Sequence, residues 1–133
     1  MTGQIHQDSI HILVAEDEAM LRRLFTGVLE SAGFQVLAAE DGKEAVRVAH
    51  EYPGPIQLLI SNFRMPCLSG LEVARRVRAL IPDVRVLLIS GYPANMLVLD
   101  RGWEFLQKPF LPRTLLEKVR ALLSLPLEAE KLP

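Results

Sequence analysis

The segment LLISNFRMP, residues 58–66, decides how this chain folds. Its apolar residues follow one another without polar alternation, which is typical of a strand buried on both faces of a parallel sheet. The run begins at Ile56 and ends at the polar residues Ser61 and Asn62, and Met65-Pro66 then shape a loop. Similar runs occupy residues 10–15 and 84–89, and shorter ones occupy 34–38 and 103–106. The sequence therefore predicts five buried strands.

Segments with helical spacing separate these strands. Apolar stripes at intervals of three and four residues run through residues 21–29, 45–52, 71–81 and 115–123. Asp41 with Glu44, and Ser69 with Glu72, have the spacing of a capping box at a helix start. Alternating strands and helices favour an α/β fold, a flavodoxin-like doubly wound five-stranded parallel sheet of order 2-1-3-4-5 with helices on both faces. Residues 93–99 leave room only for a short fourth helix.

Length and composition indicate one domain. The 133 residues are 50% hydrophobic, and we expect a domain over 10–124 with polar or Pro-punctuated tails at 1–9 and 125–133. The net charge of -1, with no basic block, argues against direct contact with nucleic acid. A lone cysteine, Cys67, and the absence of an apolar leader or membrane-length run favour a soluble cytoplasmic protein.

Polar side chains follow four of the predicted strands at the point where each strand ends. The carboxyl ends of parallel strands meet at one edge, so we expect these groups to lie together; they are Glu16-Asp17, Asn62, Ser90 and Lys108. Two adjacent acids can hold Mg²⁺, while a hydroxyl and an ammonium suit a phosphoryl group. The chemistry lacks only a carboxylate acceptor, because Asn62 is an amide.

The motifs at these strand ends together resemble the receiver domain of two-component response regulators (CheY-like). They are ILVAEDE at 12–18, LLISNFRMP at 58–66 followed by Gly70, LLISG at 87–91 and FLQKPF at 105–110. The resemblance runs from about residue 10 to residue 124. It implies a bacterial, cytoplasmic signalling protein rather than an enzyme.

The resemblance also implies a role for each matching residue. Glu16 and Asp17 would bind Mg²⁺ together with position 62 and the backbone carbonyl of Arg64, and Asn62 would occupy the phosphoacceptor position. Ser90 would be the switch hydroxyl, Phe105 the switch aromatic, and Lys108 the phosphate contact. An amide is a poor nucleophile and removes one negative charge, so we expect neither phosphorylation at Asn62 nor strong Mg²⁺ binding.

Several interpretations stay open at this point. Asn62 is native in a phosphorylation-independent pseudo-receiver that acts as an interaction module, or it is engineered, or it is a sequence error. The resemblance implies a histidine kinase or histidine phosphotransfer protein as partner, and no direct contact with a membrane. A homodimer that forms through the face of the fourth helix and the fifth strand is a further alternative. The domain stands alone or is excised from a hybrid histidine kinase or longer regulator.

Two other function classes share this topology. A flavodoxin-like mononucleotide-binding redox protein would need a donor-rich turn after the first strand, whereas Glu16-Asp17-Glu18 repels phosphate. A Mg²⁺-dependent phosphatase would need an Asp-x-Asp arrangement, which this turn does not supply.

Overall fold

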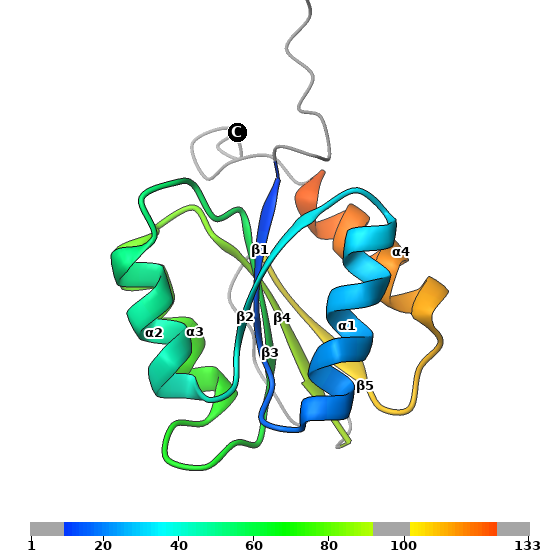
Figure 1. The fold of residues 1–133 in the computed structure, drawn as a ribbon, viewed down its shortest axis with the longest axis horizontal. Coiled ribbons are helices and arrows are strands. Elements are labelled where there is room, and N and C mark those ends of the chain that lie inside the picture. Colours follow the sequence, from blue (N-terminus) through cyan, green and yellow to red (C-terminus); the bar gives the residue numbers. More distant parts are fainter. Residues whose placement is uncertain (1–9, 92–101, 125–133) are drawn as a thin grey trace, which may run out of the picture.

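The computed structural model describes residues 10–91 and 102–124 of the chain. Within them, a five-stranded parallel sheet has the order β2-β1-β3-β4-β5 (Figure 1). The strands are β1 (His11–Ala15), β2 (Gln35–Ala39), β3 (Leu58–Asn62), β4 (Arg85–Ser90) and β5 (Trp103–Gln107). The helices are α1 (Ala19–Ser31), α2 (Gly42–Glu51), α3 (Gly70–Leu80) and α4 (Pro112–Leu123). The predicted flavodoxin-like fold and strand order are confirmed.

Helices cover both faces of the sheet and explain why the middle of each central strand is apolar. Helices α1 and α4 lie on one face, and α2 and α3 lie on the other (Figure 1). In β1, Ile12 and Val14 belong to the core under α1 and α4, while Leu13 and Ala15 belong to the core under α2 and α3. Successive side chains of a strand point to opposite faces, so the central strands of a sheet covered on both sides are apolar at consecutive positions.

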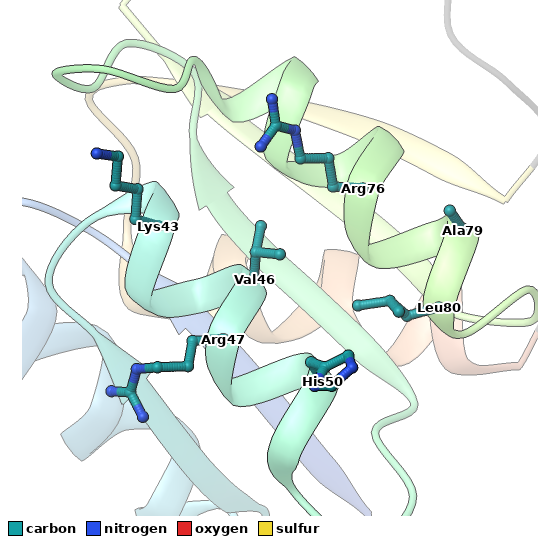
Figure 2. Close-up of a pocket in the computed structure, with 7 residues that line it drawn as sticks. All are labelled: Lys43, Val46, Arg47, His50, Arg76, Ala79 and Leu80. Atoms are coloured by element: carbon teal, nitrogen blue, oxygen red, sulfur yellow. The ribbon is translucent and has the colours of Figure 1, made fainter.

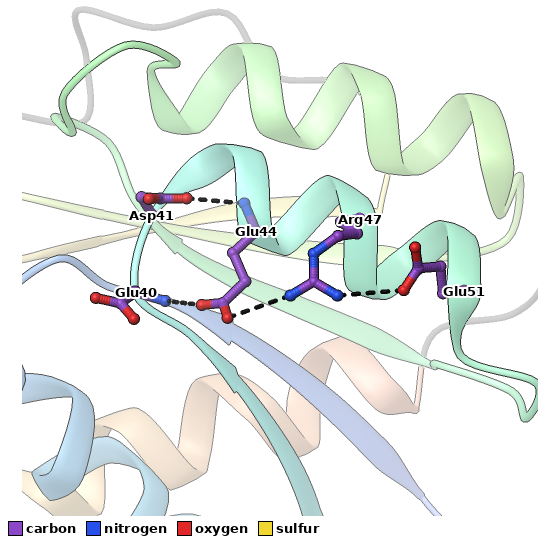
Figure 3. Close-up of polar contacts among 5 residues, drawn as sticks. All are labelled: Glu40, Asp41, Glu44, Arg47 and Glu51. Carbon is purple, nitrogen blue, oxygen red and sulfur yellow. Dashed lines mark hydrogen bonds and ion pairs between the residues drawn. The ribbon is translucent and has the colours of Figure 1, made fainter.

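Side-chain caps fix the starts of α2 and α3 as the sequence predicts. The Oδ1 atom of Asp41 accepts a hydrogen bond from the Glu44 N–H at 2.8 Å, and the Oγ atom of Ser69 accepts one from the Glu72 N–H at 3.2 Å. The return bond differs from an ideal capping box, since the Glu44 carboxylate accepts from the Glu40 N–H at 2.7 Å (Figure 3). Both helices begin after the chain leaves the carboxyl end of a strand, α2 after β2 and α3 after β3.

Some predictions fall outside the described residues. These are the short fourth helix over 93–99 and the two tails at 1–9 and 125–133. The helix labelled α4 is therefore the one predicted over residues 115–123, and it begins at Pro112. Across residues 10–91 and 102–124, no helix has both the length and the apolar character needed to span a bilayer.

Candidate functional site

The carboxyl ends of four strands lie along one edge of the sheet and bring the predicted polar groups together. The strand register pairs Ala15 with Ser61, Asn62 with Ile89, and Ser90 with Gln107. Just beyond the strands, the Lys108 N–H donates to the Ser90 carbonyl oxygen at 2.7 Å, which ties the end of β5 to the end of β4. The residues at or just after the ends of β1, β3, β4 and β5 therefore share this edge.

The amide of Asn62 bridges the two acids. Its Nδ2 atom donates to Oε2 of Glu16 and to Oδ1 of Asp17, each at 3.3 Å. The same Oε2 atom accepts a second bond from the Glu18 N–H at 3.0 Å. The side chain of Glu16 is fully buried, at 0% exposure, whereas Asp17 is exposed. The site thus has one inner and one outer carboxylate, and both contact the same amide nitrogen.

Burial raises the pKa of the Glu16 carboxyl above its usual value. The hydrogen bond from the Glu18 N–H and the positive charge of Lys108 act in the opposite direction, and the neighbouring Asp17 reinforces the rise. The positive charge of Lys108 therefore acts on the inner carboxylate. The sequence-predicted residues Glu16, Asp17, Asn62 and Lys108 are therefore in one electrostatic neighbourhood.

The three remaining predicted residues differ in their surroundings. Ser90 ends β4 and is 3% exposed. Phe105 pairs in register with Leu88 and is buried in the core shared with α2 and α3. Arg64 is exposed in the loop that follows β3. The structure thus places Phe105 in the core and Arg64 on the surface, with Ser90 at the site edge.

The structure gives three further residues a part in the site that the sequence analysis does not assign to them. The Glu18 N–H holds Oε2 of Glu16, and the Arg22 guanidinium donates to the Glu16 carbonyl oxygen at 2.8 Å. Gly70 packs so closely that an added Cβ would overlap the Asn62 carbonyl oxygen. The sequence shows Gly70 as part of a motif, but only the structure shows that it supports the backbone of Asn62.

The residues present fit a divalent cation with a reduced donor set. Mg²⁺ prefers carboxylate and other hard oxygen ligands together with water. The Oε1 atom of Glu16 is buried and has no hydrogen-bond partner among the described residues, which leaves one carboxylate oxygen to coordinate. In the described part of the chain, no three side chains of His, Cys, Asp or Glu form a cluster that could hold a metal. Mg²⁺ would therefore depend on Glu16 and Asp17 and on neutral oxygens.

A separate hollow lies between α2 and α3, away from these groups (Figure 2). Its volume is about 510 Å³, and it is lined by Lys43, Val46, Arg47, His50, Arg76, Ala79 and Leu80. The guanidinium of Arg47 pairs with Glu44 and Glu51, and that of Arg76 pairs with Glu72. The hollow contains none of the polar strand-end residues, so the candidate site is the edge of the sheet.

Comparison with known proteins agrees with the geometry. The family model of the response regulator receiver domain matches residues 12–120 of this chain. The response regulator receiver protein CpdR of Brucella abortus is 34% identical over 116 residues, which cover 84% of this chain and 95% of CpdR. The receiver domain of the hybrid histidine kinase CckA superposes with a TM-score of 0.77 at 37% identity, covering 86% of this chain and 99% of that domain. TrrA of Thermotoga maritima, solved with Mg(2+)-BeF, has a TM-score of 0.74 at 33% identity, covering 84% of this chain and 97% of TrrA.

The sheet, its polar edge and these matches define a signalling module rather than a classical enzyme. The chain belongs to the response regulator receiver domain family of two-component signal transduction. The curated relatives differ in length. The chain spans only 13% of the sensor kinase CckA of Brucella abortus and 48% of the regulator ArcA of Escherichia coli.

Proposed function

We propose that this chain is a receiver domain that binds its signalling partner without being phosphorylated at Asn62. The observation that carries the proposal is the position of the Asn62 side chain. Asn62 ends β3, and its amide contacts both Glu16 and Asp17, which follow β1. That is the position from which an acceptor carboxylate would act. An amide nitrogen is a much weaker nucleophile than a carboxylate oxygen. No acyl phosphate therefore forms at position 62.

The neighbouring hydroxyl does not replace the missing acid. Ser61 is buried, and its Oγ atom donates to the Asn62 carbonyl oxygen at 3.2 Å. Successive strand residues point to opposite faces, so the Ser61 side chain faces away from the side on which Asn62 contacts Glu16 and Asp17. This geometry supports a resting state that phosphorylation does not change.

The other site residues keep the family roles in the proposal. Ser90 and Phe105 occupy the positions of the switch pair, and Lys108 occupies the position that would contact the phosphate oxygens of a phosphorylated receiver. Glu16, Asp17, Asn62 and the Arg64 carbonyl would hold Mg²⁺, whose chemistry is to neutralise a phosphoryl group and which binds more weakly with an amide at position 62. Without an acceptor, these groups support one fixed arrangement of the site edge.

The outer surface of α1 supports binding of a protein partner. Met20 is 79% exposed and Leu24 is 49% exposed, and residues four apart lie on the same side of a helix. Leu24 also lines a hollow of about 490 Å³ between α1 and α4, together with Val28 and Leu116. Large apolar side chains that gather on a surface mark interaction sites. We propose a cytoplasmic histidine kinase or histidine phosphotransfer protein as the partner.

Two further options rank lower. A homodimer through the fourth-helix and fifth-strand face stays a prediction, and its helical half lies outside the described residues. A mononucleotide-binding redox protein is disfavoured because the Glu18 N–H, a donor that a flavin phosphate would need in the turn after β1, is already bonded to Glu16.

Acetyl phosphate tests the proposal on the native chain. We expect the intact mass to stay unchanged after incubation with Mg²⁺ and acetyl phosphate, because position 62 offers no nucleophilic oxygen. A stable gain of one phosphoryl group, mapped to the peptide that contains Ser61 and Asn62, would contradict it.

A further inference from the structure

The Asn62 amide occupies the place between the two carboxylates where a cation would be expected. One Nδ2 atom lies 3.3 Å from Oε2 of Glu16 and 3.3 Å from Oδ1 of Asp17. An amide NH₂ group carries two donor hydrogens, so one nitrogen can serve both acceptors. Like a bound cation, it presents positive charge, here only partial, to both acids.

Burial makes such a donor favourable for the Glu16 carboxyl. The carboxyl of Glu16 is fully enclosed, and burial of a charged group without partners is costly. Its Oε2 atom has two donors, the Glu18 N–H and the Asn62 amide, while its Oε1 atom has no partner among the described residues. The amide therefore supplies one of the few compensating contacts that the inner carboxylate has.

The same contacts oppose cation binding. A cation between the acids would meet the N–H hydrogens of Asn62, whose partial charge has the same sign. To offer its oxygen instead, the amide would have to turn over and give up its bonds to Glu16 and Asp17. Both bonds are long at 3.3 Å, but giving them up would remove a donor from the buried Glu16 carboxylate, so this exchange lowers the gain from cation binding.

We propose that the Asn62 amide is a resident substitute for the divalent cation, which holds the acid pair in one arrangement with or without Mg²⁺. The inference rests on the proposed function, because it describes what keeps the unphosphorylated site in its resting form. It goes further because it attributes the weak binding of Mg²⁺ to the hydrogens that the amide donates, and not only to the loss of one negative charge.

Thermal unfolding of the full chain in EDTA and in millimolar Mg²⁺ tests this assignment. We expect the native midpoint to differ by less than about 1 °C between the two conditions. The Asn62→Asp chain, with a third carboxylate in the cluster, should unfold earlier in EDTA and gain about 5 °C or more with Mg²⁺. Glu117→Gln, an exposed change on α4, controls for general ionic effects and should behave like the native chain.

The Asn62→Ala chain distinguishes an effect of the donated hydrogens from an effect of the missing negative charge. It has the same charge as the native chain but lacks the amide donors, so we expect a midpoint that rises with Mg²⁺ by more than the native one does. Asn62→Leu, which nearly matches the shape of Asn, serves the same purpose if the Ala chain does not fold. If the donor-free chains are as insensitive to Mg²⁺ as the native chain, or if the native chain responds as strongly as Asn62→Asp, the inference is wrong. Either outcome leaves the phosphorylation test untouched, since that test measures mass.

Discussion

Replacing Asn62 with Asp is expected to produce a chain that takes one phosphoryl group from acetyl phosphate when Mg²⁺ is present. The new carboxylate oxygen attacks phosphorus, the bond between phosphorus and the acetyl oxygen breaks, and acetate leaves. Position 62 already contacts Glu16 and Asp17, and the positive charge of Lys108 acts on the Glu16 carboxyl. Charge stabilisation by such groups supports phosphoryl transfer once a nucleophile is supplied. We therefore expect a nearly all-or-none difference from the native chain.

Intact mass spectrometry of the two chains measures this difference directly. The adduct should form on the Asp chain only, and EDTA should suppress it because the transfer needs a cation at the acid pair. The Asn62→Ala chain is the matched control and should stay unmodified. A folded Asp chain without an adduct would mean that position 62 is not the acceptor position. An adduct on the Ala chain would mean that another side chain reacts.

Replacing Gly70 with Ala should lower the free energy of unfolding by about 3 kcal/mol. Gly70 is the first residue of α3, and its N–H donates to the Phe63 carbonyl oxygen at 2.7 Å. A Cβ at this position would overlap the Asn62 carbonyl oxygen and lie 2.8 Å from Cα of Phe63. Both neighbours are backbone atoms, so relief requires the end of β3 and the start of α3 to separate. The same shift would displace Asn62 from the acid pair.

Denaturant unfolding checks this loss against a matched glycine. Gly27 lies within α1, and a Cβ there would meet nothing within 4 Å. Gly27→Ala should therefore raise stability by about 0.5–1 kcal/mol, as Ala is the better residue inside a helix. Equal effects at the two glycines would show that close packing between β3 and α3 is not what requires Gly70.

The fold could be predicted from sequence because its determinants are local and repeated. Apolar runs without alternation predict doubly covered strands, as the Leu58 to Ile60 stretch of β3 shows. The caps at Asp41 and Ser69 form as the spacing predicts. Strand ends could also be assigned to one edge, because parallel strands leave no other arrangement. Residues 93–99, where the pattern is weakest, lie outside the described part of the chain.

The details of the site could not be predicted, because they depend on atoms that the sequence does not place. Nothing in the Glu16-Asp17 pair tells which acid is buried. The direction in which the Asn62 amide points depends on both carboxylates at once, and the Glu18 N–H and Arg22 contacts depend on the turn into α1. Cys67 likewise has a φ of 70°, in the left-handed region that favours glycine, although its side chain gives no sign of this.

The side-chain amide resonances of Asn62 in the isotope-labelled native chain test the central claim most directly. If the amide holds both carboxylates in place of a cation, its two protons will give distinct, hydrogen-bonded signals that do not move as millimolar Mg²⁺ is added. If these signals instead shift and saturate during the titration, Mg²⁺ displaces the amide from Glu16 and Asp17. In that case Asn62 does not substitute for the cation.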